Sequence, residues 1–155
     1  MAFDRVDWHW DSASALYCRK HGISSDDLTQ AQIREIDLYA ANHIGLFLRW
    51  LIENDLVGKD ADRKCCEKVR NGQMSGAEYL LDCCDGKFWD ADVKKDALAF
   101  VRFYYGENAY LDDYTQCCTN ETDKPVYGVL TGENDYLLLK QNIDRAFMLF
   151  KALGL

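Results

Sequence analysis

The apolar residues of this chain recur at helical spacing, most strongly between residues 28 and 56. One face of this segment follows alternating steps of four and three residues: Ile36, Ala40, His43, Phe47 and Trp50. The run from Ile44 to Ile52 is apolar at almost every position, with Arg49 as its charged exception. A helix that is apolar on all sides is buried on all sides. This run is too short to span a bilayer. We therefore predict a buried central helix, about residues 28–56, in an all-α domain.

Shorter segments with helical spacing flank the central helix, and polar or glycine-containing connections separate them. They cover about 12–20, 60–70, 75–84, 90–105, 108–118 and 134–153. Ser75 and Glu78 match the capping-box pattern that begins a helix. The candidate strand is 126–131, and because it has no obvious partner we expect at most a minor β segment there. The chain shows no linker or repeat, so the pattern predicts one helical bundle over residues 1–155.

The composition fits a folded, acidic protein. The chain has 155 residues, of which 48% are hydrophobic, and its formal net charge is −8. That charge argues against binding nucleic acid, where Lys and Arg must replace counterions, and it favours a basic protein partner. The N-terminal sequence lacks the basic and apolar regions of a signal peptide, so we expect a cytoplasmic protein with no membrane segment.

Seven cysteines invite a metal or disulfide interpretation. They are Cys18 and the doublets 65–66, 83–84 and 117–118. Paired zinc ligands are usually two to four residues apart, and adjacent residues of a helix point about 100° apart. Buried, reduced cysteine acting as a small apolar residue fits a reducing cytosol better. We therefore predict no metal site and no cofactor.

Few residues suggest catalysis. His43 lies on the buried face of the central helix beside Gly45, and Trp8 and His9 form a W-H pair near the N-terminus. A hydrogen-bonded core histidine explains His43, and close approach of another backbone or a bulky ring explains Gly45. No spacing joins a nucleophile to a base, and no glycine-rich loop could hold a phosphate. We assign no catalytic residue, but a site near Trp8, His9 and His43 remains the functional alternative.

Acidic residues concentrate between residues 82 and 123. This segment holds ten acidic and four basic residues, which leaves a local charge of −6. Tyrosines are interleaved with the carboxylates, a combination suited to a basic protein surface. The predicted partner-binding residues, which we call the acidic tyrosine face, are Asp82, Asp85, Asp90, Asp92, Asp96, Tyr105, Tyr110, Asp112, Asp113 and Tyr114. The alternative is an ordinary solvated acidic surface.

Four short motifs together resemble an uncharacterised family of small bacterial proteins. The motifs are Asp4 before Trp8-His9; H-x-G-x-F-L-x-W-x-I at residues 43–52; Gly76-Ala77 with Asp85-Gly86; and Tyr110-Leu111-x-Asp113-Tyr114. The chain has Asn42 where a threonine is common in that family. The resemblance covers most of residues 4–150 and implies no assigned chemistry. Families of this kind resemble small acidic proteins found beside secreted bacterial toxins, which implies an immunity protein.

Two main hypotheses follow. The first is a cytosolic protein-binding protein, specifically an immunity protein that occludes the active site of a cognate toxin through the acidic tyrosine face. The second is a small enzyme or ligand-binding domain with its pocket near Trp8, His9 and His43. A regulatory subunit unrelated to toxins is difficult to distinguish from the first hypothesis. The identity of the partner and the oligomeric state are not predicted.

Overall fold

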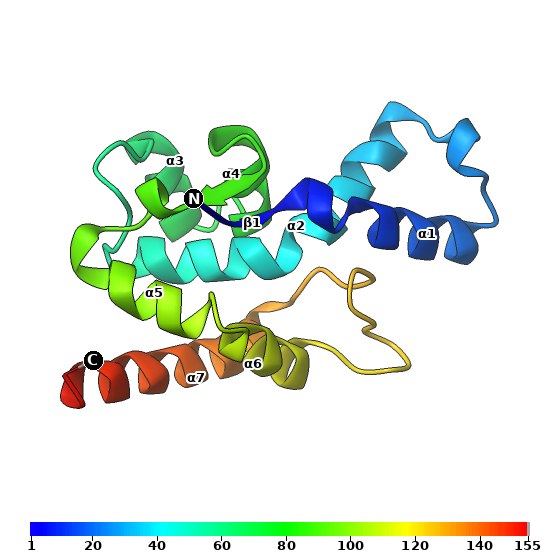
Figure 1. Cartoon of the computed structure of the whole chain (residues 1–155). Helices are drawn as coiled ribbons and strands as arrows, with labels where there is room; N and C mark the ends of the chain where they lie inside the picture. Colours follow the sequence, from blue (N-terminus) through cyan, green and yellow to red (C-terminus); the bar gives the residue numbers. More distant parts are fainter. Residues whose placement is uncertain (155) are drawn as a thin grey trace.

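The computed structural model describes residues 1–154, and helix α2 (Gln30–Glu53) runs through the middle of the molecule (Figure 1). A capping box between Thr29 and Gln32 begins this helix. Every residue from Ala40 to Leu48 is buried, as predicted for the central helix. The helix is shorter than residues 28–56 at both ends. Leu155, the last residue of the predicted domain, lies outside the described residues.

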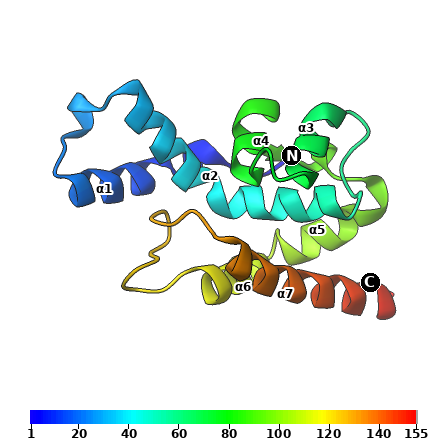
Figure 2. The ribbon, with the colours of Figure 1, turned by 180° about the vertical axis from the view of Figure 1, so that it is seen from behind.

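Helices on two sides cover α2 (Figures 1 and 2). On one side lie α3 (Arg63–Arg70), α4 (Gly76–Cys83) and the N-terminal segment, and on the other lie α5 (Leu98–Tyr104), α6 (Ala109–Cys118) and α7 (Glu133–Ala152). Helix α1 (Trp10–His21) packs against the first part of α2. Short 3-10 helices occupy Val6–Trp8 (η1), Ser25–Asp27 (η2), Asp90–Asp92 (η3) and Lys95–Ala97 (η4). The predicted all-α class is confirmed.

A small sheet lies where no strand was predicted. Strand β1 (Ala2–Arg5) pairs antiparallel with β2 (Lys87–Trp89), with Asp4 opposite Phe88. The candidate strand at 126–131 does not form, in keeping with the expectation of at most a minor β segment there, and these residues make a turn and an irregular connection. The predicted helix at 90–105 is also shorter than expected, since two 3-10 turns precede α5.

A very close backbone contact joins α2 to α4. A Cβ atom on Gly45 would overlap the backbone of Gly76 and Ala77, and a Cβ on Gly76 would overlap the backbone of Gly45. The close approach expected at Gly45 is therefore with a backbone and not with an aromatic ring. A capping box between Ser75 and Glu78 begins α4 at this contact, as predicted from the sequence.

The cysteine doublets follow the prediction only in part. A disulfide joins Cys65 of α3 to Cys83 of α4, so the expectation of reduced cysteines is wrong for this pair. The spacing of the cysteines did not indicate this disulfide, because the bond joins a cysteine of the 65–66 doublet to a cysteine of the 83–84 doublet. The other five cysteines are free thiols, and Cys66 and Cys118 are buried.

The described helices also bear on the membrane prediction. None of the helices in residues 1–154 combines the length and the apolar character needed to cross a bilayer.

The contact between the two glycines predicts a strong stability effect. We expect Gly45→Ala to lower the free energy of unfolding by about 2 kcal/mol or more, because overlap with α4 outweighs the roughly 1 kcal/mol gain in helix propensity. Gly132→Ala is the control, since its Cβ would meet nothing within 4 Å and its φ of −77° is ordinary. Urea unfolding measures both variants, and equal effects would contradict the packing argument.

Candidate functional site

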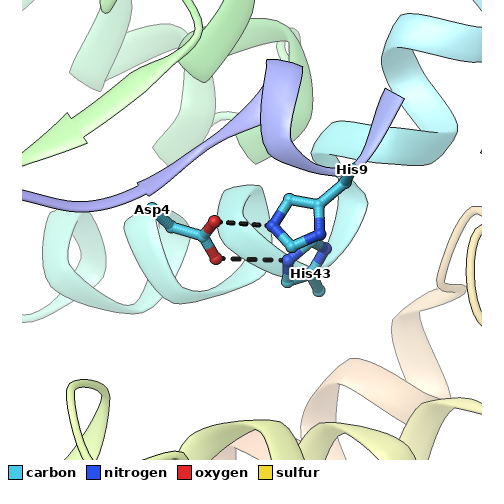
Figure 3. A group of neighbouring side chains, drawn as sticks. All are labelled: Asp4, His9 and His43. Carbon is cyan, nitrogen blue, oxygen red and sulfur yellow. Dashed lines mark hydrogen bonds and ion pairs between the residues drawn. The ribbon is translucent and has the colours of Figure 1, made fainter. Parts of the chain in front are cut away.

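The N-terminal segment carries a carboxylate and an imidazole onto the central helix (Figure 3). Asp4 comes from β1, His9 lies between η1 and α1, and His43 comes from the middle of α2. The β1–β2 pairing fixes the start of this segment. The turn that follows is held by two backbone hydrogen bonds, from Val6 N to Gly86 O and from His9 N to Val6 O. Residues far apart in sequence therefore meet at one point, which we call the Asp–His–His centre.

The carboxylate of Asp4 lies to one side of the two imidazoles and directs one oxygen at each (Figure 3). His9 Nε2 is 2.6 Å from Asp4 Oδ1, and His43 Nε2 is 3.3 Å from Asp4 Oδ2. The two rings meet edge to face with their centroids 4.4 Å apart. Asp4 is 5% exposed and His43 is 3% exposed, whereas the His9 side chain is 17% exposed, so the centre is buried at Asp4 and His43 and reaches solvent at His9.

Two tyrosines and one backbone group complete the surroundings. Tyr105 Oη donates a hydrogen bond to Asp4 Oδ2 (2.7 Å), and the backbone N–H of Arg5 donates to Asp4 Oδ1 (2.9 Å). Tyr127 Oη lies 2.6 Å from His9 Nδ1. Both ring nitrogens of His9 therefore have partners, and the hydrogen bond at Nδ1 helps to fix the ring orientation.

The backbone of Tyr127 has an uncommon conformation. Its φ of 66° lies in the left-handed region, which costs an L-residue with a bulky side chain roughly 1–2 kcal/mol. The adjoining turn is closed by a hydrogen bond from Gly128 N to Pro125 O. This turn keeps the Tyr127 hydroxyl on His9, at the outer side of the centre.

The surroundings of the centre favour an ionised Asp4 carboxylate beside an uncharged His43 imidazole. Burial alone would raise the pKa of the Asp4 carboxyl, but its contacts with His43 and His9 hold that pKa well below the usual value. Burial, together with a smaller effect of His9, lowers the pKa of His43 by more than the neighbouring carboxylate raises it. Asp4 is therefore a carboxylate near neutral pH, and His43 is an uncharged imidazole.

One atom of the centre lacks a partner. Within residues 1–154, His43 Nε2 is the buried side-chain nitrogen or oxygen that makes no hydrogen bond. It lies close to Asp4 Oδ2 but is not aligned for a hydrogen bond with it. Buried polar atoms are rarely left unsatisfied, because desolvation without a partner costs about 1–3 kcal/mol. This nitrogen therefore needs either a ligand or a small adjustment of the ring.

The same three side chains have the composition of a metal site. Asp4, His9 and His43 can each offer one ligand atom, and these atoms lie within 4.8 Å of one another. Two imidazole nitrogens and one carboxylate oxygen suit zinc, iron and related divalent transition metals. Tyr105 on the carboxylate and Tyr127 on His9 would then be the outer hydrogen-bond partners that orient metal ligands.

The sequence analysis found part of this centre. The structure brings His9 and His43 together, as the functional alternative required, but Trp8 is 59% exposed and has the Arg5 guanidinium over its ring. Asp4 was visible only as the acidic residue before the W-H pair. Tyr105 and Tyr127 carried no signal of their own, because tyrosine occurs widely in cores and on surfaces.

The tyrosines of the predicted acidic tyrosine face are not on the surface of the structure. Tyr105, Tyr110 and Tyr114 are buried, so they do not lie on the surface as predicted. They pack α6 and the end of α5 against α2, where Tyr110 Oη donates to the His43 carbonyl and Tyr114 Oη accepts a hydrogen bond from Asn42. Tyrosine was misassigned because its ring is apolar enough for the core when its hydroxyl finds a partner.

The aspartates of that face are more varied. Asp85, Asp96 and Asp112 are exposed. Five of the seven are held by groups of the same chain: Asp82 by Arg34, Asp85 by Lys87, Asp90 by the amine of Met1, Asp92 by the N–H of Trp89 and Asp113 by Tyr104. Their binding to a partner stays a prediction.

The Asp4 network predicts a graded stability effect. We expect Asp4→Ala to lower the free energy of unfolding by about 3 kcal/mol or more, because several buried donors lose their acceptor. Tyr105→Phe removes one of these bonds and should cost about 1–2 kcal/mol. Asp7→Ala, which breaks an exposed pair with Arg5, is the control and should cost less than about 1 kcal/mol. Urea unfolding would contradict this account if Asp4→Ala matched Asp7→Ala.

Comparison with known proteins places this centre within one family. No curated protein and no solved structure matches the chain. A family profile described as a domain of unknown function, DUF7832, matches residues 2–129. The match contains the whole Asp–His–His centre with its two tyrosines, and it ends before α7. Because it covers most of the sequence, the chain belongs to the DUF7832 family.

Proposed function

We propose that this chain is a metal-binding domain that holds one divalent transition-metal ion at Asp4, His9 and His43. The observation that carries the proposal is the buried Nε2 of His43, which has no hydrogen-bond partner and faces the Asp4 carboxylate. A metal ion would bind this nitrogen in the tautomer that carries the ring proton on Nδ1. The proposal develops the functional alternative of a small enzyme or ligand-binding domain, with Asp4 in place of Trp8.

The three ligand atoms lie within 4.8 Å of one another and would have to move closer together to hold an ion. Metal–nitrogen and metal–oxygen bonds of about 2.0–2.2 Å place neighbouring ligand atoms roughly 3–3.5 Å apart. The separation between His43 Nε2 and Asp4 Oδ2 is already 3.3 Å, and that between His9 Nε2 and Asp4 Oδ1 is 2.6 Å. To bind an ion, His9 Nε2 would lose its hydrogen bond with Asp4 and carry no proton, and the ring proton would lie on Nδ1, which would donate it to Tyr127 Oη.

The ligand set would leave coordination positions open. Two histidines and one carboxylate occupy three positions, and catalytic metal sites reserve the others for water or substrate. Bound metal would lower the pKa of such a water and could polarise a substrate oxygen. The contribution of this chain's own residues is to hold the imidazoles in place: Tyr127 orients His9, and burial keeps His43 neutral.

A purely structural network is the rival interpretation. In that case Asp4 would only fasten the N-terminal segment to α2, and His43 would be satisfied by a small ring rotation. Stability measurements cannot separate the two interpretations, since both predict that loss of Asp4 is damaging. Metal binding separates them directly.

Metal binding is measured with Co²⁺ as a spectroscopic probe and Zn²⁺ as a competitor. We expect one equivalent of Co²⁺ to give visible d–d bands typical of nitrogen and oxygen ligands. Asp4→Asn and His9→Gln should each weaken affinity by at least about tenfold, and Tyr127→Phe should weaken it by roughly tenfold through the outer hydrogen bond. His21→Ala is the matched control, because His21 is exposed at the end of α1.

Two outcomes would overturn the proposal. One is the absence of stoichiometric binding to the folded wild-type chain. The other is a spectrum with intense thiolate-to-cobalt charge-transfer bands that Asp4→Asn leaves unchanged, which would place the ion at cysteines. Circular dichroism establishes that each variant is folded, and Tyr127→Phe leaves all three proposed ligands intact.

We also propose that the chain binds a basic protein partner, as an immunity protein binds its cognate toxin. The support is electrostatic: the net charge is −8, and Asp96 and Asp112 are exposed and form no ion pair within residues 1–154. The buried tyrosines leave this binding to the exposed carboxylates.

The double charge reversal Asp96→Lys with Asp112→Lys tests the partner proposal. It should weaken capture of a co-expressed neighbouring toxin in a salt-dependent manner, because complementary charge steers association. The control is Asp26→Lys, which reverses an exposed charge in η2, away from the 82–123 segment. Unchanged affinity in the double variant would contradict the assignment of this surface.

A further inference from the structure

A disulfide fastens α3 to α4 on one side of the central helix. It joins Cys65, in the first turn of α3, to Cys83, the last residue of α4. Figures 1 and 2 show the two helices side by side against the same side of α2. Both cysteines are partly exposed, which brings the bond close to solvent.

Each of the two helices is also held on α2 without the disulfide. In α3, Val69 is buried, and Arg70 Nη2 donates a hydrogen bond to the carbonyl of Ile52 in α2. In α4, Leu80 is completely buried, and Gly76 lies against the backbone of α2. The bond is therefore added to helices that are already packed, and the fold can persist with the bond formed or broken.

The chain between the two cysteines forms one wall of a cleft. The cleft has a volume of about 640 Å³ and lies between α2, the connection from α3 to α4, and the start of α7. Every residue from 69 to 78 lines it, and all of them lie between Cys65 and Cys83. Linking the ends of such a segment restricts the conformations open to the residues inside it.

We propose that the bond between Cys65 and Cys83 is a reversible redox switch, which an anionic low-molecular-weight thiol such as glutathione opens and the corresponding disulfide closes. When the bond is formed, the 69–78 wall is tied at both ends. When it is broken, the wall moves more freely while α3 and α4 stay on α2. The switch thus links the redox state of the surroundings to the mobility of the cleft wall.

Two thiol–disulfide exchange steps open the switch. A thiolate of the small thiol attacks Cys83 Sγ, the bond to Cys65 breaks, and Cys65 leaves as a thiolate that takes up a proton from water. A second thiolate attacks the small-molecule sulfur of the mixed disulfide, which releases Cys83 and forms the small-molecule disulfide. The two cysteines are thereby reduced by two electrons, and two small thiols are oxidised. Closing reverses both steps.

The charges on α3 favour an anionic thiol and this order of attack. Arg63, Lys64 and Lys68 are exposed and form no ion pair within residues 1–154. They outnumber the carboxylate of Asp62, which caps the helix beside Cys65. These cations and the positive end of α3 stabilise a thiolate on Cys65, and exchange is fastest when the leaving sulfur forms the more stable thiolate. They also attract an anionic thiol to a chain whose net charge is −8.

The neighbouring cysteines do not compete for the bond. Cys66 is completely buried, and its Sγ donates a weak hydrogen bond to Tyr79 Oη. Burial raises the pKa of the Cys84 thiol to about 12, so this thiol stays protonated near neutral pH. Because the thiolate is the nucleophile in exchange, Cys65 and Cys83 keep each other as partners.

The switch does not rest on the proposed metal site. Asp4, His9 and His43 all lie outside the segment between the two cysteines. The redox experiment is made on the chain without added metal, so the two proposals can fail independently.

Hydrogen exchange of the wild-type chain in glutathione redox buffers tests the switch. Alkylation and mass spectrometry should count seven thiols in reduced glutathione and five in oxidised glutathione, with Cys65 and Cys83 as the pair that forms and reopens. Reduction should raise the exchange rates of the 69–78 amides by at least about tenfold, because the wall is released. The amides of α5 and α7 should exchange equally in both states.

Matched variants test the pairing and the role of charge. Cys83→Ser should exchange like the reduced wild type in either buffer, and Cys18→Ser, which removes a cysteine that is free in the structure, should switch like the wild type. A sample quenched during reduction should carry glutathione on Cys83 and a free thiol at Cys65. Lys64→Glu combined with Lys68→Glu should slow opening by glutathione, relative to opening by the cationic thiol cysteamine, by at least about threefold.

Four results would overturn the switch. They are a chain that forms no Cys65–Cys83 bond in oxidised glutathione, a bond that survives an excess of reduced glutathione, equal exchange of the 69–78 amides in both states, and reduction that accelerates exchange throughout the chain. The last result would make the bond a requirement of the fold. Glutathione found on Cys65 in the quenched sample would refute the order of attack, and an unchanged ratio of the two opening rates would refute the role of the α3 charges.

Discussion

The buried carboxylate of Asp4 is the interaction on which the arrangement of this domain depends. Removing an ionised group from water costs several kcal/mol unless hydrogen bonds and charges replace its hydration. Asp4 obtains those partners from three parts of the chain: the backbone of Arg5, the ring of His9 and the hydroxyl of Tyr105. The N-terminal segment, the end of α5 and, through His43, the central helix are thereby brought to one point.

The central helix can take part in this network because it is buried on all sides. Two adjacent residues serve different segments: Asn42 holds Thr131 and Tyr114, while His43 faces Asp4. The same stretch contains Gly45, whose missing side chain lets α4 approach. Since α4 leads into β2, and β2 pairs with the strand that carries Asp4, the glycine contact and the carboxylate depend on one another. The contact of α2 with α4 therefore helps to place the Asp4 carboxylate beside His43.

The sequence predicted features that arise from local signals and missed those that arise from distant pairing. The course of α2, the capping box at Ser75 and the close approach at Gly45 were readable because each follows from spacing or from a single residue type. The partnership of Asp4 with His43 joins residues 39 positions apart, and no periodicity shows that. The buried tyrosines were misread for a related reason: a hydroxyl leaves tyrosine suited to either environment, and only the presence of a buried acceptor decides between them.

The proposed metal site accounts for an imbalance in the hydrogen bonds of the centre that a structural network alone would not require. A network selected only to fasten the N-terminal segment would be most stable with every donor and acceptor satisfied, because a half-satisfied buried network is costly. Here the Asp4 carboxylate accepts several hydrogen bonds, whereas the buried Nε2 of His43 makes none. The uneven distribution is what a site for a cation would leave behind: an anion held ionised, a neutral imidazole with an uncommitted nitrogen, and a second imidazole oriented from behind by Tyr127. The strained backbone of Tyr127 fits the same interpretation, because strain of this kind persists where the surroundings require one side-chain position.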